Sequence, residues 1–226
     1  MKIPNINVAA SLNQWLTYLV IIAYNVKIQI EQPALNNELN ELINEIKNKI
    51  ALHNLLNDYK ANQVRNLFKK IKLDPTKYRP SSEALFRRCH KDGYIPFINN
   101  IVAICNYCSL KYLIPIGCYD LDKISDNLTI KIGKRDEKFF SLRSTEFMAE
   151  GRIIIADAQG AFGSPIVDSI RASVKEDSKN IALVYFLPIT IEEQFYEEAP
   201  EFTKELLKKY ASPSEIIFLL NKTIRN

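Results

Sequence analysis

The spacing of apolar residues changes twice in the first part of the chain. Residues 15–30 (WLTYLVIIAYNVKIQI) are rich in β-branched and aromatic side chains and alternate toward the end, which predicts at least one buried strand. After Pro33, apolar side chains recur at steps of three and four from Asn36 to Leu56, which predicts an amphipathic helix. We interpret this helix as a surface helix packed on a sheet; a partner-binding helix is the alternative.

Prolines and glycines divide the following stretch into three more helices. The first is expected over Lys60–Lys72, and an Asp-Pro pair stops it because proline disfavours helix in the residue before it. Ser81 or Ser82 can cap the second, which Gly93 ends. The third covers Asn99–Tyr112 (NNIVAICNYCSLKY) and has an almost wholly apolar body.

Beyond Pro115 the pattern becomes that of short strands. We expect a strand at Leu128–Ile132 pairing with Lys138–Leu142, and buried strands at Arg152–Ala156 and Ile181–Leu187. Two glycines within residues 157–165 (DAQGAFGSP) indicate a turn or a loop of close approach. The acidic run Glu192–Glu201 leads into a helix, and residues 212–214 (SPS) are expected to cap a last helix that ends near Thr223.

These elements predict an α+β protein in which helices surround a mixed sheet. A length of 226 residues is sufficient for one large domain. The net charge of +4 permits a polyanionic partner without requiring one, because acidic residues nearly balance the basic ones. No signal peptide or membrane-spanning run is evident, and four cysteines without an export signal are expected to be reduced thiols, so we expect a cytoplasmic protein.

Several side chains are candidates for chemistry. Cys105 and Cys108 have the spacing of a redox or half-zinc motif, but no second ligand pair accompanies them, so we interpret them as small core residues. Arg79 lies just ahead of a helix N-terminus, where a guanidinium suits phosphate or carboxylate recognition. Asn106 lies in an apolar helix body, so it either fixes a loop by hydrogen bonds or reaches into a pocket.

Two acidic segments complete the candidates. Asp120 and Asp122 are two residues apart, and a structural role in a turn is the default interpretation. Asp168, Ser169 and Arg171 follow the glycine-containing loop, where a carboxylate, a hydroxyl and a guanidinium come together. The sequence contains no nucleophile elbow, P-loop or dinucleotide fingerprint.

Four of these motifs occur in a recognisable order: RPSSEALFRRC, INNIVAICNYCSL, PIGCYDLDKI, and a D-x-x-G loop followed by DSIRASVKEDSKNIALV. In this order they resemble the B3/B4 domain of the phenylalanyl-tRNA synthetase β subunit, which also exists as freestanding proteins. The resemblance covers about residues 72–187 and implies a layered β/β/α fold. We expect a single B3/B4-like domain over residues 1–226, with an N-terminal strand and helix and C-terminal helices added to that core.

In the synthetase this domain hydrolyses tyrosine wrongly esterified to the phenylalanine tRNA. The resemblance therefore implies a tRNA or aminoacyl-tRNA partner, with no DNA, membrane, metal or other cofactor involved. By position it implies Asn106, Asp168 and Arg171 as catalytic residues. The implied substrate-binding residues are Arg79, Ser82, Pro115, Gly117, Tyr119, Asp120, Asp157, Gly160 and Ser169.

Two positions depart from the bacterial synthetase pattern. Gly117 stands where the synthetase domains usually carry a histidine, and Ile170 stands at or beside the position of a glutamate. Both of those groups are associated with editing in the family. Two hypotheses follow: a freestanding hydrolase of mischarged tRNA, or a non-catalytic module that binds RNA or a small amino-acid-like ligand.

Overall fold

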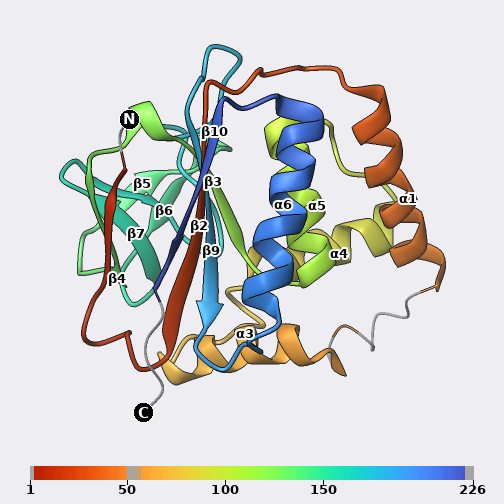
Figure 1. Cartoon of the computed structure of the whole chain (residues 1–226). Coiled ribbons are helices and arrows are strands. Elements are labelled where there is room, and N and C mark those ends of the chain that lie inside the picture. The colour runs from red at the N-terminus through yellow and green to blue at the C-terminus, as the bar shows by residue number, and fades with distance from the viewer. Residues whose placement is uncertain (1–2, 50–54, 56, 222–226) are drawn as a thin grey trace.

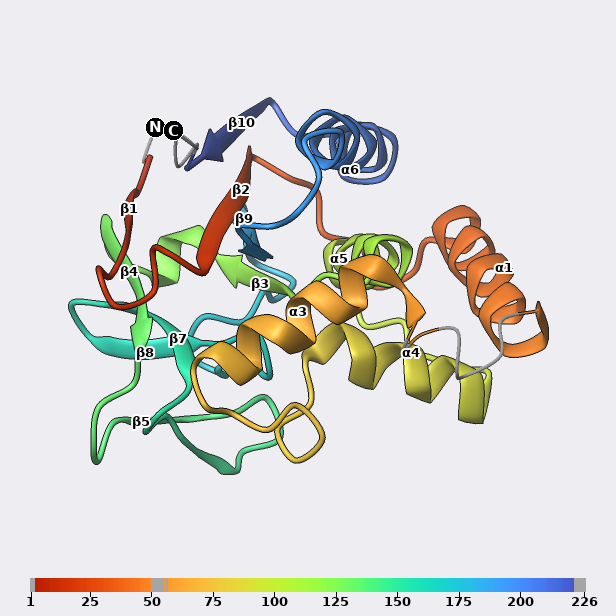
Figure 2. The same ribbon diagram turned by 90° about the horizontal axis from the view of Figure 1, so that it is seen from below.

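The computed structural model describes residues 3–49, 55 and 57–221. Two β-sheets are stacked, and helices cover the outer face of one of them (Figures 1 and 2). The helices are α1 (Pro33–Lys49), α3 (Tyr59–Lys70), α4 (Ser81–Asp92), α5 (Asn100–Tyr112), the short 3-10 helix η1 (Leu121–Lys123) and α6 (Phe195–Ala211). The arrangement is the expected α+β fold in β/β/α layers.

The central sheet has the strand order β10-β2-β9-β3 and is antiparallel throughout. It consists of β10 (Glu215–Leu220), β2 (Leu16–Tyr24), β9 (Ile181–Pro188) and β3 (Ile116–Asp120). Every residue of β2 and β9 is buried, because helices cover one face and the second sheet covers the other. Odd-numbered side chains such as Leu183 face the helices, whereas even-numbered ones such as Val184 face the second sheet.

The second sheet has the order β1-β4-β7-β8 and is mixed, because β1 and β4 run parallel while the other pairs are antiparallel. Its strands are β1 (Asn5–Val8), β4 (Asn127–Ile132), β7 (Ile153–Asp157) and β8 (Gly160–Gly163). A separate hairpin joins β5 (Lys138–Phe140) to β6 (Glu146–Met148). No helix among the described residues is long and apolar enough to cross a membrane.

Local sequence explains where the helices begin and end. The Asp58 carboxylate accepts a hydrogen bond from the Ala61 amide at the start of α3, and the Asn99 side chain accepts one from the Val102 amide at the start of α5. Gly93 adopts a left-handed conformation (φ 66°) directly after α4, as expected of a helix-ending glycine. The predicted helix over residues 36–56 is α1 as far as Lys49; its last predicted turns fall largely outside the described residues.

Three local predictions are corrected by the structure, and one strand was not predicted. The strand at residues 138–142 pairs with β6, not with β4, whose neighbours are β1 and β7. Residues 157–165 contain β8, so the glycines bound a short strand within the expected loop. The segment after Ser212 is the strand β10, not a helix, because β2 offers it a free edge to pair with. β1 lacked a signal in the sequence.

One buried asparagine connects three parts of the helical layer. Asn100 is fully buried, and its side-chain amide donates to the carbonyl oxygens of Lys27 (2.8 Å) and Tyr210 (2.7 Å). Its side-chain oxygen accepts a hydrogen bond from the Gln29 amide at 3.0 Å. It therefore fixes the chain after β2 and the C-terminal end of α6 to the first turn of α5.

Replacing Asn100 by alanine should lower the free energy of unfolding by about 2–4 kcal/mol, because two buried carbonyl groups lose their donors. Urea unfolding followed by circular dichroism measures the change. Asn48→Ala on the exposed face of α1 is the matched control and should stay within about 0.5 kcal/mol of the wild type. Equal effects of the two substitutions would contradict the proposed connecting role.

Candidate functional site

Residues 164–173 pack along the outer edge of β3 and bring the two halves of the predicted site together. Asp120 donates its amide hydrogen to the Ala172 carbonyl at 2.9 Å, and Tyr119 forms an antiparallel bridge with Ser173. At the other end of this segment, the Ser81 amide at the start of α4 donates to the Pro165 carbonyl at 2.8 Å. Three of the sequence motifs therefore meet here.

Asp168 is the central side chain of this contact. Its carboxylate accepts a hydrogen bond from the Tyr119 hydroxyl at 2.6 Å and one from the Cys118 amide at 3.2 Å. Burial raises the pKa of the Asp168 carboxyl to about 7, although these hydrogen bonds act in the opposite direction. A carboxyl group that titrates near neutral pH can accept or donate a proton under physiological conditions.

The Tyr119 ring fills the space between the two sheets at this point. It is fully buried and packs edge-on against Phe162, with ring centroids 5.0 Å apart. A Cβ atom added to either Gly117 or Gly163 would lie 2.1 Å from the Tyr119 hydroxyl oxygen, so the ring occupies this position because both neighbours are glycines. Burial, followed by the nearby Asp168 carboxylate, raises the pKa of Tyr119 far above its usual value.

Arg171 belongs to a second cluster on the same segment. Its guanidinium donates to both carboxylate oxygens of Asp157, at 2.9 and 3.1 Å, and to the Gly160 carbonyl at 3.2 Å. Burial acts to raise the pKa of Asp157, but the hydrogen bonds from Arg171 and from the Ser125 and Gln159 amides outweigh it, so the pKa is lowered. This ion pair fixes the β7–β8 turn to the segment that carries Asp168.

The remaining predicted residues have contacts within the fold. Ser82 donates its hydroxyl hydrogen to the Leu113 carbonyl, which ties α4 to the end of α5. Asp120 accepts a 2.6 Å hydrogen bond from the Ser178 hydroxyl. Ser169 is buried, and its hydroxyl oxygen accepts a hydrogen bond from the Ala172 amide. The Pro115 carbonyl accepts the Phe186 amide. Arg79 lies 3.5 Å from the carboxylate of Glu83.

A family model described as the B3/4 domain matches residues 63–197 of this sequence, which is more than half of the chain. The chain belongs to the B3/4 domain family. It is 26% identical over 172 residues to the phenylalanine–tRNA ligase beta subunit of Fusobacterium nucleatum, which is 74% of this chain and 20% of that protein. It is 30% identical over 101 residues to the same subunit from Aquifex aeolicus, which is 43% of this chain and 13% of that protein.

The chain thus spans a fifth or less of the length of these relatives. Among solved structures it is similar to an N-terminal fragment of the phenylalanyl-tRNA synthetase β subunit from Pyrococcus horikoshii. That comparison has a TM-score of 0.46 and 14% sequence identity, and covers 100% of this chain and 56% of the fragment.

The structure shows what surrounds Gly117 and Ile170, the two positions at which this B3/4 domain departs from the synthetase pattern. The Tyr119 ring occupies the space over Gly117, so a histidine at that position would require the ring to move. Ile170 is 46% exposed and lies opposite Phe140 in a short pairing around the Ser141–Ser169 bridge. Asp168 and Leu142 are opposite each other in the same pairing, so exposed apolar residues lie beside the segment that carries Asp168.

Asn106 lies apart from the Asp168 contact network. It is partly buried on α5, and within the described part of the chain no hydrogen bond or ion pair connects it to Asp168 or Arg171. Its neighbour Cys105 is closer to the site, because the Cys105 thiol is within hydrogen-bonding range of the Cys118 thiol, a contact that, together with burial, raises the pKa of Cys105. The sequence contained no signal for this pair, since the two cysteines belong to different elements.

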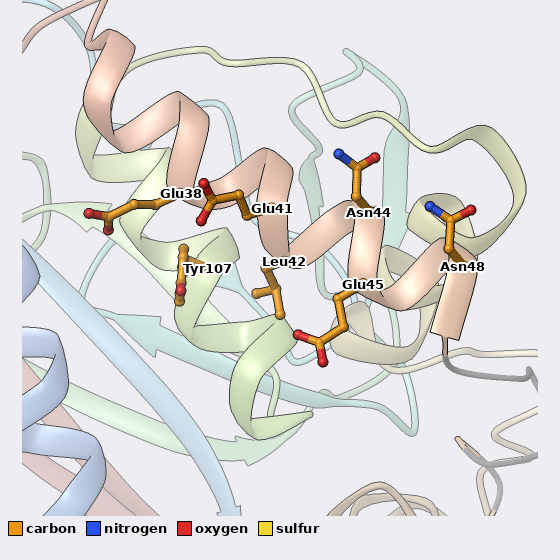
Figure 3. A pocket seen from close by; sticks show the side chains of 7 residues that line it. All are labelled: Glu38, Glu41, Leu42, Asn44, Glu45, Asn48 and Tyr107. Atoms are coloured by element: carbon orange, nitrogen blue, oxygen red, sulfur yellow. The ribbon is translucent and has the colours of Figure 1, made fainter.

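The structure also contains hollows away from these residues. One, with a cavity volume of about 490 Å³, lies between α1 and α5 and is lined by Glu38, Glu41, Glu45 and Tyr107 among others (Figure 3). A second, of about 430 Å³, lies beside Ile30 and Val174. Neither is lined by a predicted catalytic residue. Among the described residues, no group of three or more His, Cys, Asp or Glu side chains is arranged to hold a metal ion.

The raised pKa of Asp168 predicts how stability depends on pH. Burial raises the pKa of this carboxyl to about 7 in the folded protein, so it keeps its proton up to about that pH, whereas in the unfolded chain it ionises near its usual pKa of 3.8. The free energy of unfolding should therefore fall as the pH rises through this window, and Asp168→Asn should remove that part of the fall. Thermal unfolding from pH 4 to 8 tests this, with exposed Asp136→Asn as the control that keeps the wild-type slope.

The packing of Tyr119 predicts an energetic coupling with Gly117. Gly117→Ala should destabilise the protein by about 1–3 kcal/mol, because the added methyl group overlaps the tyrosine ring. In a Tyr119→Leu background, where the distal ring atoms are missing, the same substitution should cost less. Urea unfolding of the four proteins gives the coupling free energy; additive effects would show that the ring does not limit position 117.

Proposed function

We propose that this B3/4 domain protein hydrolyses the ester bond of a mischarged aminoacyl-tRNA in trans. The single observation that carries the proposal is the Asp168 carboxyl group, which is held by the Tyr119 hydroxyl and the Cys118 amide and whose pKa burial raises to about 7. Membership of the family to which the editing domain of the phenylalanyl-tRNA synthetase β subunit belongs supports the choice of substrate.

In this proposal the ionised Asp168 acts as a general base. It accepts a proton from a water molecule, assisted by a free hydroxyl of the terminal ribose, while that water attacks the ester carbonyl carbon. The bond from this carbon to the ribose oxygen then breaks, and the proton passes to the ribose oxygen. The products are a free amino acid and a tRNA with an intact terminal ribose.

The other proposed residues have orienting roles. Asn106 is proposed to orient the substrate from the helical side of the site. Arg171 is proposed to act through its ion pair with Asp157, which holds the Asp168 segment in place. The exposed Phe140, Leu142 and Ile170 offer an apolar surface next to Asp168, which favours an amino acid with an apolar or aromatic side chain.

A specific observation also favours a second function. The Tyr119 ring fills the space over Gly117, and Ile170 offers no polar side chain where the synthetase has a glutamate. A domain with these two substitutions can keep the ligand surface without the editing chemistry. The second candidate is therefore a module that binds RNA or a small amino-acid-like ligand.

A deacylation assay with Tyr-, meta-Tyr- and other aminoacyl-tRNAs separates the two functions. We expect release of at least one amino acid above the uncatalysed rate, with a rate that rises with pH to a plateau above about pH 7, because the base form of Asp168 is required. Asp168→Asn should slow release about 100-fold or more. Asp136→Asn, in an exposed loop with a positive φ that asparagine tolerates, should keep full activity.

If none of these substrates is released faster than in buffer, the hydrolase proposal is wrong. In that case, ligand-dependent thermal stabilisation by an amino acid or by RNA would support the binding module.

A further inference from the structure

Three arginines converge on one buried carboxylate at the start of α4. Glu83 is 3% exposed, and its carboxylate lies 2.7 Å from an Arg65 nitrogen, 2.9 Å from the Arg87 Nε atom and 3.5 Å from the Arg79 Nε atom. The arginines come from three segments: α3, the loop before α4, and α4 itself. A buried carboxylate is retained in a fold only when it is paired, so Glu83 explains why the guanidinium groups gather here.

One carboxylate does not balance three guanidinium groups. The cluster around Glu83 carries two more positive than negative charges, and the arginine side chains are 17%, 40% and 28% exposed for Arg65, Arg79 and Arg87. Glu83 leaves most of their nitrogen donors unused, since each guanidinium has five. The Nε atom of Arg79 is buried and has no hydrogen-bond partner among the described residues.

A second guanidinium group whose buried Nε atom lacks a hydrogen-bond partner in the described part of the chain, that of Arg152, contacts Tyr78, the residue before Arg79. Arg152 stacks between the rings of Tyr78 and Phe147, 4.4 and 5.1 Å from their centroids. Lys77 adds a further positive charge next to Tyr78. The surface thus combines arginine forks with an aromatic ring.

Asp74, an acidic residue of the same region, already has hydrogen-bond partners. Asp74 accepts hydrogen bonds from the Thr76 and Lys77 amides, and these, with the Arg65 charge nearby, lower its pKa. With Asp74 and Glu83 counted against Arg65, Arg79, Arg87, Arg152 and Lys77, the region keeps a net charge of +3. It also adjoins the segment that carries Asp168, because the Ser81 amide contacts the Pro165 carbonyl.

From this arrangement we propose that the Glu83-centred arginines form a binding site for phosphate groups, and that these are the backbone phosphates of RNA. Arginine forks pair with phosphate oxygens in a bidentate geometry, and buried Glu83 holds them in position before the ligand arrives. Several cations spread over separate segments suit a chain of phosphates. The choice of RNA rests on the proposed function; the phosphate site itself does not.

Arg79→Gln is the decisive substitution, because it removes the longest and most exposed of the three contacts and leaves Glu83 paired with two arginines. Binding of a fluorescently labelled single-stranded RNA ending in CCA, followed by anisotropy, should weaken on the order of tenfold. The slope of log K against log salt should become shallower by about 0.7, as expected for one lost phosphate contact. Arg79→Lys keeps the positive charge but not the forked guanidinium group, so its RNA affinity should lie between those of the wild type and Arg79→Gln.

Arg88→Gln is the matched control. Arg88 lies on α4, which follows Arg79, is exposed and has no ion pair with Glu83, so its loss should leave the affinity within about twofold. A second arm measures the thermal stabilisation of each protein by inorganic phosphate. One outcome is that phosphate stabilises the wild type but not Arg79→Gln, while the wild type does not bind the RNA. That outcome would support a site for small phosphate compounds and overturn the assignment to RNA.

Equal effects of Arg79→Gln and Arg88→Gln, or no binding of either ligand, would overturn the phosphate site. Asp168→Asn separates this proposal from the hydrolase proposal, since it should slow deacylation about 100-fold or more, whereas Arg79→Gln should weaken RNA binding.

Discussion

The architecture depends on burying β2 and β9 on both faces. Alternate side chains of each strand pack in two separate cores, one shared with the helices and one shared with the second sheet. A strand buried in this way cannot shift register by one residue without exchanging the contents of the two cores. This pair of strands positions β3, which borders β9, and with it the Cys118 amide and the Tyr119 hydroxyl that bind Asp168.

The candidate site arises from the free edge of that sheet. β3 pairs with β9 on one side only, so the amide groups on its outer side need other partners. The Ala172 carbonyl satisfies the Asp120 amide, and the Asp168 carboxylate satisfies the Cys118 amide. The contact that brings a titratable group to this place thus also closes the sheet edge.

The sequence predicted most elements that have a strong period, including β2, α3, α4, α5 and β9, and the motif order predicted the family. It failed for β10, because an apolar segment next to a helix cap has no local feature that distinguishes a paired edge strand from a helix. For Tyr119 the resemblance implied a role in substrate binding, and the sequence carried no signal for the position of its ring. The ring lies between the sheets because Gly117 and Gly163 leave room for it, and that depends on two strands distant in sequence.

The grouping of Arg65, Arg79 and Arg87 around Glu83 likewise depends on contacts between separate segments, which the sequence does not indicate. The sequence indicated only that Arg79, just ahead of a helix, suits phosphate or carboxylate recognition, whereas the structure places it together with Arg65 and Arg87 around Glu83. A buried carboxylate surrounded by an excess of guanidinium groups contributes little to stability on its own, since burying the charges costs about as much as their pairing returns. The pairing with Glu83 leaves an excess of positive charge, which the proposed phosphate ligand would balance.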